Sequence, residues 1–192
     1  MIRSRLLLPV LCLALGCFHP SPPVTYYTLT PLPREAPAPP PSGIALEVMP
    51  VRLPELLQRP QMVVPQDSGA LGLAETQRWG NPLDQDMRRL LVENLGMLLS
   101  SDAVVASPYG DRVAAAYRLE VEVRGCTVQP GTGLNFEAVW MVTRPGAAKA
   151  LLVRRTELRE ALAGPGPDAL AAAHSRALGA LSREIAEAIR RL

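Results

Sequence analysis

Few residues in this sequence have the types and spacing that chemistry requires. The chain has two histidines, His19 and His174, and three cysteines. No Cys and His spacing is typical of a zinc site. No glycine-rich loop leads from a strand pattern into a helix pattern, as phosphate binding would require. His174 lies in an alanine-rich helical pattern, which favours a histidine that is packed or at the rim of the core.

Two carboxylates, Glu120 and Glu122, alternate on one predicted strand and would lie about 6–7 Å apart. That separation could suit a pair of catalytic carboxylates. Arg118 and Arg124 flank them on the same face, however. This pattern favours a solvated ion-pair surface. The sequence therefore predicts no catalytic residue, no cofactor and no metal site.

The N-terminal residues have the pattern of a cleaved export signal. Arg3 and Arg5 precede an apolar run over residues 6–15, which is too short to span a membrane as a helix. Residues 13–17, Leu-Ala-Leu-Gly-Cys, resemble the lipobox of bacterial lipoproteins, which implies cleavage after Gly16 and lipidation of Cys17. Phe18 is not the aspartate of an inner-membrane retention signal, which implies sorting to the outer membrane. The alternative is an ordinary secreted protein cut nearby.

The mature chain would begin at Cys17 and carry balanced charge. The 20 Lys and Arg lose Arg3 and Arg5 with the signal and then equal the 18 Asp and Glu. A neutral chain is not typical of nucleic-acid binders. Cys126 would be left as a free thiol, and its strand pattern favours a packed apolar role. If Cys17 carries no lipid, a Cys17–Cys126 disulfide is the alternative.

Residues 17–42 are predicted to be a tether that follows the signal peptide of residues 1–16. Proline-rich stretches at 18–23 and 31–42 favour extended polyproline conformations. Between them, residues 24–30 are rich in β-formers and predict a short strand. We expect this strand to dock on the domain edge or on a partner.

Residues 43–192 are predicted to form a single α/β domain with two main helices on a mixed β-sheet. Asn81 and Pro82 predict a helix start, and a leucine stripe follows to about residue 99. Residues 117–124 and 134–142 alternate apolar and polar side chains, which predicts an antiparallel hairpin. A half-buried strand is expected at 44–48. Further strands are expected at 61–64, 71–76, 103–106 and 150–157, and a last helix capped by Asp168.

With these residues placed, the chain resembles the ABC-type transport auxiliary lipoproteins (PqiC/YmbA-like). The matching pieces, in order, are the lipobox cysteine and the stretches 26–29, 57–63, 75–83, 93–95, 117–119, the strand around Trp140, and 181–186. The resemblance implies a three-layer α/β/α-type domain tethered to the periplasmic face of the outer membrane. It also implies an MCE-domain protein and an ABC permease of the inner membrane as partners, in transport of lipids or other hydrophobic compounds. Assembly into a homo-oligomeric ring is compatible with it.

Partner contacts are expected at aromatic and arginine side chains, which most often anchor protein interfaces. The candidates are Tyr26, Tyr27, Arg59, Gln61, Arg78 and Trp79. Each has a structural alternative, since Trp79 could be core and the two arginines could brace loops. Two other functions are weighed: a periplasmic carrier that itself binds a lipid, and a lipoprotein hydrolase. The dense leucine stripes and the missing catalytic set argue against them.

Overall fold

The computed structural model describes residues 22–34, 40, 42–66, 70–129 and 133–192. The predicted signal peptide and Cys17 lie outside these residues. Ten regular elements make up the fold, together with short 3-10 turns at Glu55–Gln58 and Gly110–Val113. They are β1 (Thr25–Tyr27), β2 (Leu46–Val48), β3 (Gln61–Pro65), β4 (Leu71–Trp79), α1 (Leu83–Leu98), β5 (Val104–Ala106), β6 (Tyr117–Gln129), β7 (Gly133–Thr143), β8 (Leu152–Glu160) and α2 (Pro167–Ile189).

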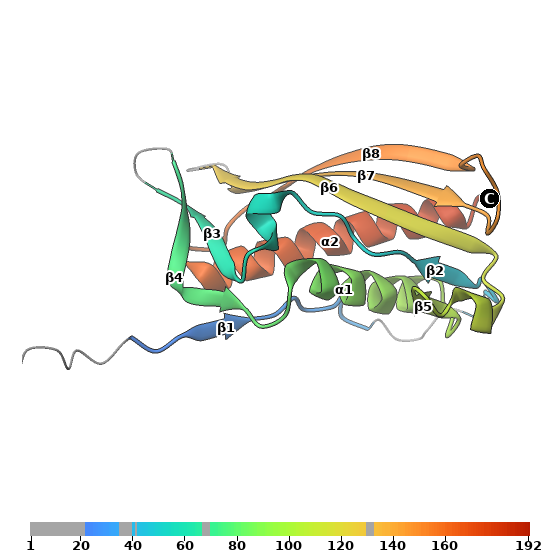
Figure 1. Cartoon of the computed structure of the whole chain (residues 1–192), viewed down its shortest axis with the longest axis horizontal. Coiled ribbons are helices and arrows are strands. Elements are labelled where there is room, and N and C mark those ends of the chain that lie inside the picture. Colours follow the sequence, from blue (N-terminus) through green and yellow to red (C-terminus); the bar gives the residue numbers. More distant parts are fainter. Residues whose placement is uncertain (1–21, 35–39, 41, 67–69, 130–132) are drawn as a thin grey trace, which may run out of the picture.

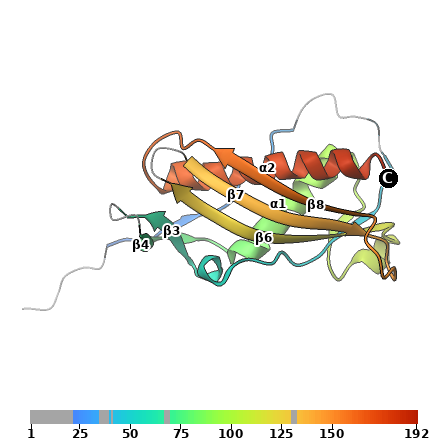
Figure 2. The same ribbon diagram turned by 90° about the horizontal axis from the view of Figure 1, so that it is seen from above.

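The strands form two mixed sheets. One has the order β5-β2-β6-β7-β8, with β2 parallel to both neighbours and β6, β7 and β8 antiparallel. The other has the order β1-β4-β3 and lies at one end of the elongated molecule (Figure 1). Helices α1 and α2 pack against each other and against one face of the five-stranded sheet (Figure 2). The predicted α/β domain with two main helices is confirmed.

Alternation along β6 and β7 decides which face of the large sheet is buried. The inward residues of β7, from Leu134 to Val142, are all buried, while the residues between them are partly exposed. The outer face carries the predicted ion pairs. Arg52 lies 3.6 Å from Glu120 and 3.7 Å from Glu122, and Arg124 lies 3.4 Å from Glu122. The ion-pair interpretation of the two glutamates is confirmed, but the expected role of Arg118 is taken by Arg52, because Arg118 lies 2.7 Å from Glu47 instead.

Strand β2 differs from its prediction, because all three of its residues are buried rather than half of them. Its edges pair with β5 and β6, α1 contacts it, and Gly110 and Arg118 contact Glu47 on the other face. Glu47 is 3% exposed. Its carboxylate accepts hydrogen bonds from the Gly110 amide at 3.1 Å and from Arg118 Nε at 2.7 Å. These partners offset the cost of burying the charge.

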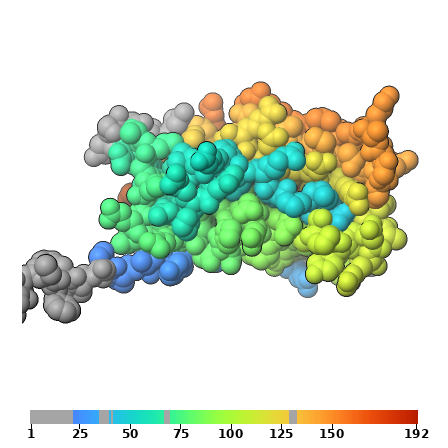
Figure 3. Space-filling model, viewed as in Figure 1, coloured from blue at the N-terminus to red at the C-terminus, as the bar shows by residue number. Residues whose placement is uncertain are grey.

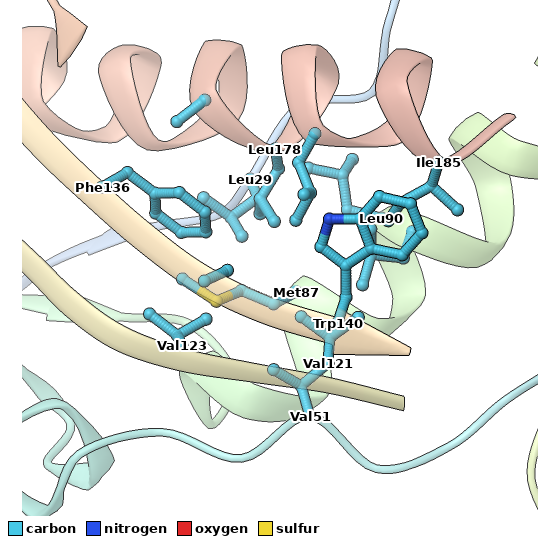
Figure 4. Packing of buried hydrophobic residues seen from close by; sticks show 14 of the residues in the cluster. Leu29, Val51, Met87, Leu90, Val121, Val123, Phe136, Trp140, Leu178 and Ile185 are labelled. Carbon is cyan, nitrogen blue, oxygen red and sulfur yellow. The ribbon is translucent and has the colours of Figure 1, made fainter. Parts of the chain in front are cut away.

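The core between the helices and the large sheet is filled by side chains from distant parts of the sequence. Figure 4 shows Leu29, which precedes the domain predicted from the sequence, among Met87 and Leu90 of α1 and Leu178 of α2. Trp140 is fully buried, and its Nε1 donates to Thr156 Oγ1 at 2.9 Å. Thr156 Oγ1 in turn donates to Glu184 Oε2 at 2.8 Å. This chain of hydrogen bonds joins β7, β8 and α2.

Both helices begin without the predicted side-chain caps. Pro82 is the N-cap of α1, so Asn81 lies one residue too early to bond its first amides. Gly166 is the N-cap of α2, with φ 116°, a conformation that glycine adopts readily. Pro167 then takes the first helical position, and Asp168 lies in the first turn, where its charge favours the helix dipole.

The Cys126 thiol should be unreactive in the folded protein. It is buried and free, and burial raises its pKa to about 12. Because the thiolate is the reactive form, a thiol reagent near neutral pH should label Cys126 only after denaturation. We expect mass spectrometry of the mature chain with Cys17→Ala to find no label on the native protein and one label in denaturant. Rapid native labelling would contradict the packed role of this residue.

Candidate functional site

Most of the predicted contact residues converge on the three-stranded sheet. Strand β1 is parallel to β4 and places Tyr26 opposite Arg78 and Tyr27 opposite Trp79. Strand β3 is antiparallel to β4 and places Gln61 opposite Arg78 from the other side. Arg59 is exposed two residues before Gln61. The structure therefore brings together residues that lie up to 53 positions apart in the sequence, between Tyr26 and Trp79.

The two faces of this sheet separate the five of these residues that lie on its strands into two groups. Tyr27 and Trp79 share the face toward the core, where Trp79 is 6% exposed and meets the His174 ring edge-on at 5.2 Å. Tyr26, Arg78 and Gln61 share the opposite face, and Tyr26 is 62% exposed. Arg78 Nε is buried and has no hydrogen-bond partner among the described residues. The geometry favours packing roles for Tyr27 and Trp79 and leaves the other face open to contact.

After β1 the chain continues across both helices, and we call residues 25–32 the N-terminal strap. The Leu29 amide donates to Asp86 Oδ2 at 2.8 Å, and the Leu29 carbonyl accepts from Arg89 Nη2 at 2.7 Å. Further along, the Thr30 amide donates to Ser175 Oγ at 3.0 Å and the Leu32 amide to Asn94 Oδ1 at 2.9 Å. Side chains of α1 and α2 thus hold the backbone of the strap.

Asp86 is the centre of this attachment. Its side chain is 2% exposed, and Arg89 lies 2.8 Å away on the same helix. Arg89 also contacts Glu93 at 3.0 Å, on the solvent side. A buried carboxylate is costly unless its lone pairs are satisfied. The Leu29 amide and Arg89 bind the lone pairs of the Asp86 carboxylate. Burial of this carboxylate therefore depends on the strap, and attachment of the strap depends on the carboxylate.

Gly179 of α2 makes room for the end of the strap. A Cβ atom at this position would lie 2.7 Å from Leu32 Cδ2, closer than packed carbons allow. The absence of a side chain lets Leu32 approach the helix backbone. Any larger residue would have to displace the Leu32 side chain.

The residues that attach the strap, Asp86 and Arg89 among them, were not singled out from the sequence. The sequence does contain a pattern that indicates this role for residues of α1. Asp86 and Asn94 are four residues to either side of the fully buried Leu90, so all three lie on one stripe of α1. Polar residues on an otherwise apolar stripe indicate a buried hydrogen-bonding role.

His174 is packed rather than at the rim, so the structure selects one of the two alternatives. It is 5% exposed, and its Nδ1 donates to the Leu170 carbonyl at 2.8 Å. Burial lowers the pKa of His174 to about 4, against a smaller opposing effect of that hydrogen bond. The ring is therefore neutral near pH 7, and it supports Trp79 from below the three-stranded sheet.

Two surface hollows lie on the part of the chain that the structure describes. One, of about 430 Å³, lies on the outer face of the large sheet around Gly125 and Asn135. Another, of about 390 Å³, lies beside Asp86 and Val92 of α1. In the part of the chain that the structure describes, no three His, Cys, Asp or Glu side chains cluster to hold a metal ion. None of the described helices is both long and apolar enough to cross a membrane.

Comparison with known proteins agrees with this fold. Residues 27–186 match a family model described as the ABC-type transport auxiliary lipoprotein component. No curated protein matches the chain. A crystal structure of an uncharacterized protein is 25% identical, with a TM-score of 0.70, and covers 88% of this chain and 99% of its own. Protein XCC0632 from Xanthomonas campestris is 18% identical, with a TM-score of 0.69, and the match covers 85% of this chain and 93% of that protein.

Replacing Asp86 should release the strap. Asp86→Ala leaves the buried Leu29 amide without its acceptor, and we expect a loss of about 1–3 kcal/mol in the free energy of unfolding. Urea denaturation measures this loss, and hydrogen exchange at the Leu29 amide should become faster. Glu93→Ala is the matched control, since Glu93 pairs with the same arginine but is exposed, and it should change stability by less than about 0.5 kcal/mol. Equal effects of the two changes would contradict the strap assignment.

His174 should make stability depend on pH. Its pKa is about 4 in the folded protein and 6.5 when unfolded, so the unfolded chain binds more protons between these values. Stability should be at its full value above pH 6.5 and fall as the pH approaches 4. His174→Gln keeps a donor for Leu170 but does not titrate, so its unfolding midpoint should vary less over this window. Identical pH profiles for the two proteins would refute the assignment.

Proposed function

The chain belongs to the family of ABC-type transport auxiliary lipoprotein components, and from this membership we propose that it is an outer-membrane-anchored subunit of an MCE/ABC-type intermembrane transport system. In this role it docks the periplasmic MCE-domain protein to the outer membrane. The ABC permease of the inner membrane is its other partner, in the movement of lipids or other hydrophobic compounds between the membranes. The protein itself contributes attachment and position rather than catalysis.

The observation that carries the proposal is the attachment of the strap. If Cys17 bears the lipid, the membrane anchor is linked through a short segment directly to residues that α1 and α2 hold. The backbone of Leu29 is bonded at both its amide and its carbonyl, and its side chain is 2% exposed. The anchor would therefore hold the folded domain itself rather than a long free linker. A protein that docks a partner at a membrane requires this property.

Of the six residues that were predicted to contact a partner, four remain candidates at the three-stranded sheet. Tyr26 and Arg59 are exposed, and Gln61 and Arg78 are half-buried on the same side as Tyr26. Tyr27 and Trp79 would act indirectly, by holding this surface in place.

The carrier alternative is less well supported, because the interior between helices and sheet is filled. Leu90, Leu91 and Leu95 of α1 and Trp140 of β7 are each 0% exposed and belong to one continuous core. A lipid carrier requires an apolar cavity large enough for acyl chains. This packing leaves the docking role as the better proposal.

The test is a pull-down from crosslinked cell envelopes, with wild-type protein and Cys17→Ala compared by mass spectrometry. We expect the wild type to capture an MCE-domain protein and to fractionate with the outer membrane. Cys17→Ala should be released from the membrane and capture much less, since anchoring raises the effective concentration of the partner.

Two results would overturn the proposal. One is recovery of lipid bound to the purified domain with no inner-membrane transport component, which would favour the carrier. The other is unchanged membrane fractionation of Cys17→Ala, which would exclude the lipid anchor. Asp102→Asn changes an exposed residue that lies far from Cys17 in the sequence. It serves as a matched control for expression and should behave as wild type.

A further inference from the structure

One end of the molecule is formed by three segments without a charged side chain. They are residues 22–27, which lead into β1 and form it, residues 70–74 at the start of β4, and residues 161–167 between β8 and α2. Figures 1 and 2 place β1, the β3–β4 hairpin and the start of α2 at the same end. One residue in five of the whole chain is charged (20%), so these three segments are poorer in charge than the rest of the chain. The charged residues Glu75, Arg78 and Asp168 lie at the same end but outside the three segments. We call this end the anchor end.

The anchor end also exposes apolar side chains. Val24 is 38% exposed, Leu71 42% and Leu73 39%. Leu71 and Leu73 lie opposite Pro65 and Val63 on one face of the β3–β4 hairpin. In Figure 3 the described N-terminal segment lies at the same end as β3 and β4, below them in the view. Exposed apolar groups gathered in one region indicate contact with another surface.

The length of the chain before β1 limits how far this end can be from the membrane. Eight residue steps separate Cys17 from Thr25. Fully extended, they reach at most about 29 Å. The strap cannot lengthen this reach while Asp86, Asn94 and Ser175 hold its backbone. By comparison, the 23 residues of α2, which run along the molecule, span about 35 Å.

The opposite end has a different composition. Exposed basic residues gather there in the β7–β8 turn, at Arg144 and Lys149, and at the end of α2, at Arg190 and Arg191. In Figure 1 the C-terminus and this turn lie away from β1. Charged side chains require water, whereas the anchor end can leave water at little cost. The two ends therefore differ in their suitability for contact with a lipid surface.

From these observations we propose that the anchor end rests on the phospholipid bilayer, with Val24, Leu71 and Leu73 at the level of the headgroups. The inference depends on the proposed lipid anchor at Cys17 and adds a second, non-covalent contact to it. The apolar patch is too small to bind a membrane alone. The anchor keeps it within reach of the bilayer, so that even a weak contact is largely occupied.

The contact would set the orientation of the domain. With only a lipid and a short chain, the long axis could lie at any angle to the membrane. Contact at the anchor end points the basic opposite end away from the membrane. The bilayer, rather than a partner protein, is the occupant that the neutral composition and the short reach favour.

Environment-sensitive fluorescent probes test this proposal. Leu73→Cys and, at the other end of the molecule, Val153→Cys, which is 59% exposed, would each carry an NBD label in the acylated mature protein. Cys126 is buried and should not react. Leu71→Cys serves as a second probe of the anchor end. The proteins are reconstituted on vesicles of phosphatidylethanolamine and phosphatidylglycerol, with or without brominated acyl chains.

We expect the probes at 73 and 71 to shift their emission to the blue on vesicles and to be quenched by brominated lipid. The probe at 153 should do neither. The same labels on a Cys17→Ala background give the emission of each probe on protein that is not bound to vesicles. Subtracting this reference removes any effect of the protein surface on the emission. If acylated protein floats with vesicles but all three probes remain in water, the bilayer contact is refuted and the anchor stands. If the acylated wild type does not float with the vesicles, the proposed lipid anchor is refuted, and the proposed bilayer contact is refuted with it.

Discussion

The burial of one carboxylate determines how the N-terminal part of this protein folds. Asp86 lies on α1 among leucines, and almost none of its side chain reaches water. An ionised group in that position requires charge and hydrogen bonds nearby. Arg89 supplies the charge, and the Leu29 amide supplies a hydrogen bond that no residue of α1 provides. The strap is thus part of the stable domain, although it precedes the first strand of the large sheet by many residues.

The strap in turn organises the smaller sheet. Strand β1 adds to β4 in parallel, and the Gly80 amide donates to the Tyr27 carbonyl at 2.7 Å, next to the start of α1. Trp79 fills the space below β1 and packs on His174 of α2. The end of the molecule that carries the chain toward Cys17 is therefore joined to both helices. Attachment, sheet and core form one connected structure.

The elements with strong periodicity could be predicted from the sequence, and those that depend on distant partners could not. Alternation placed β6 and β7, and the leucine stripe placed α1. Glu47 looked like the solvent side of a half-buried strand, because nothing local shows that Gly110 and Arg118 cover it. The six candidate contact residues converge as a group, yet Trp79 and Tyr27 face inward. The residues that hold the strap were not foreseen, since their partners are backbone amides some sixty positions away, which no side-chain pattern records.

The direction of the strap's hydrogen bonds has a mechanical consequence. A protein fixed to one membrane and bound to a partner that reaches the other membrane carries tension whenever the two membranes move apart. Tension on residue 25 pulls along the strap, whereas its bonds to β4, Asp86, Ser175 and Asn94 run across it. Such bonds are loaded in shear and must fail together rather than one after another. The strap therefore has the geometry of a joint that resists tension along the chain. On the proposed function, this geometry would let the domain transmit force between the membranes without unravelling from its N-terminus.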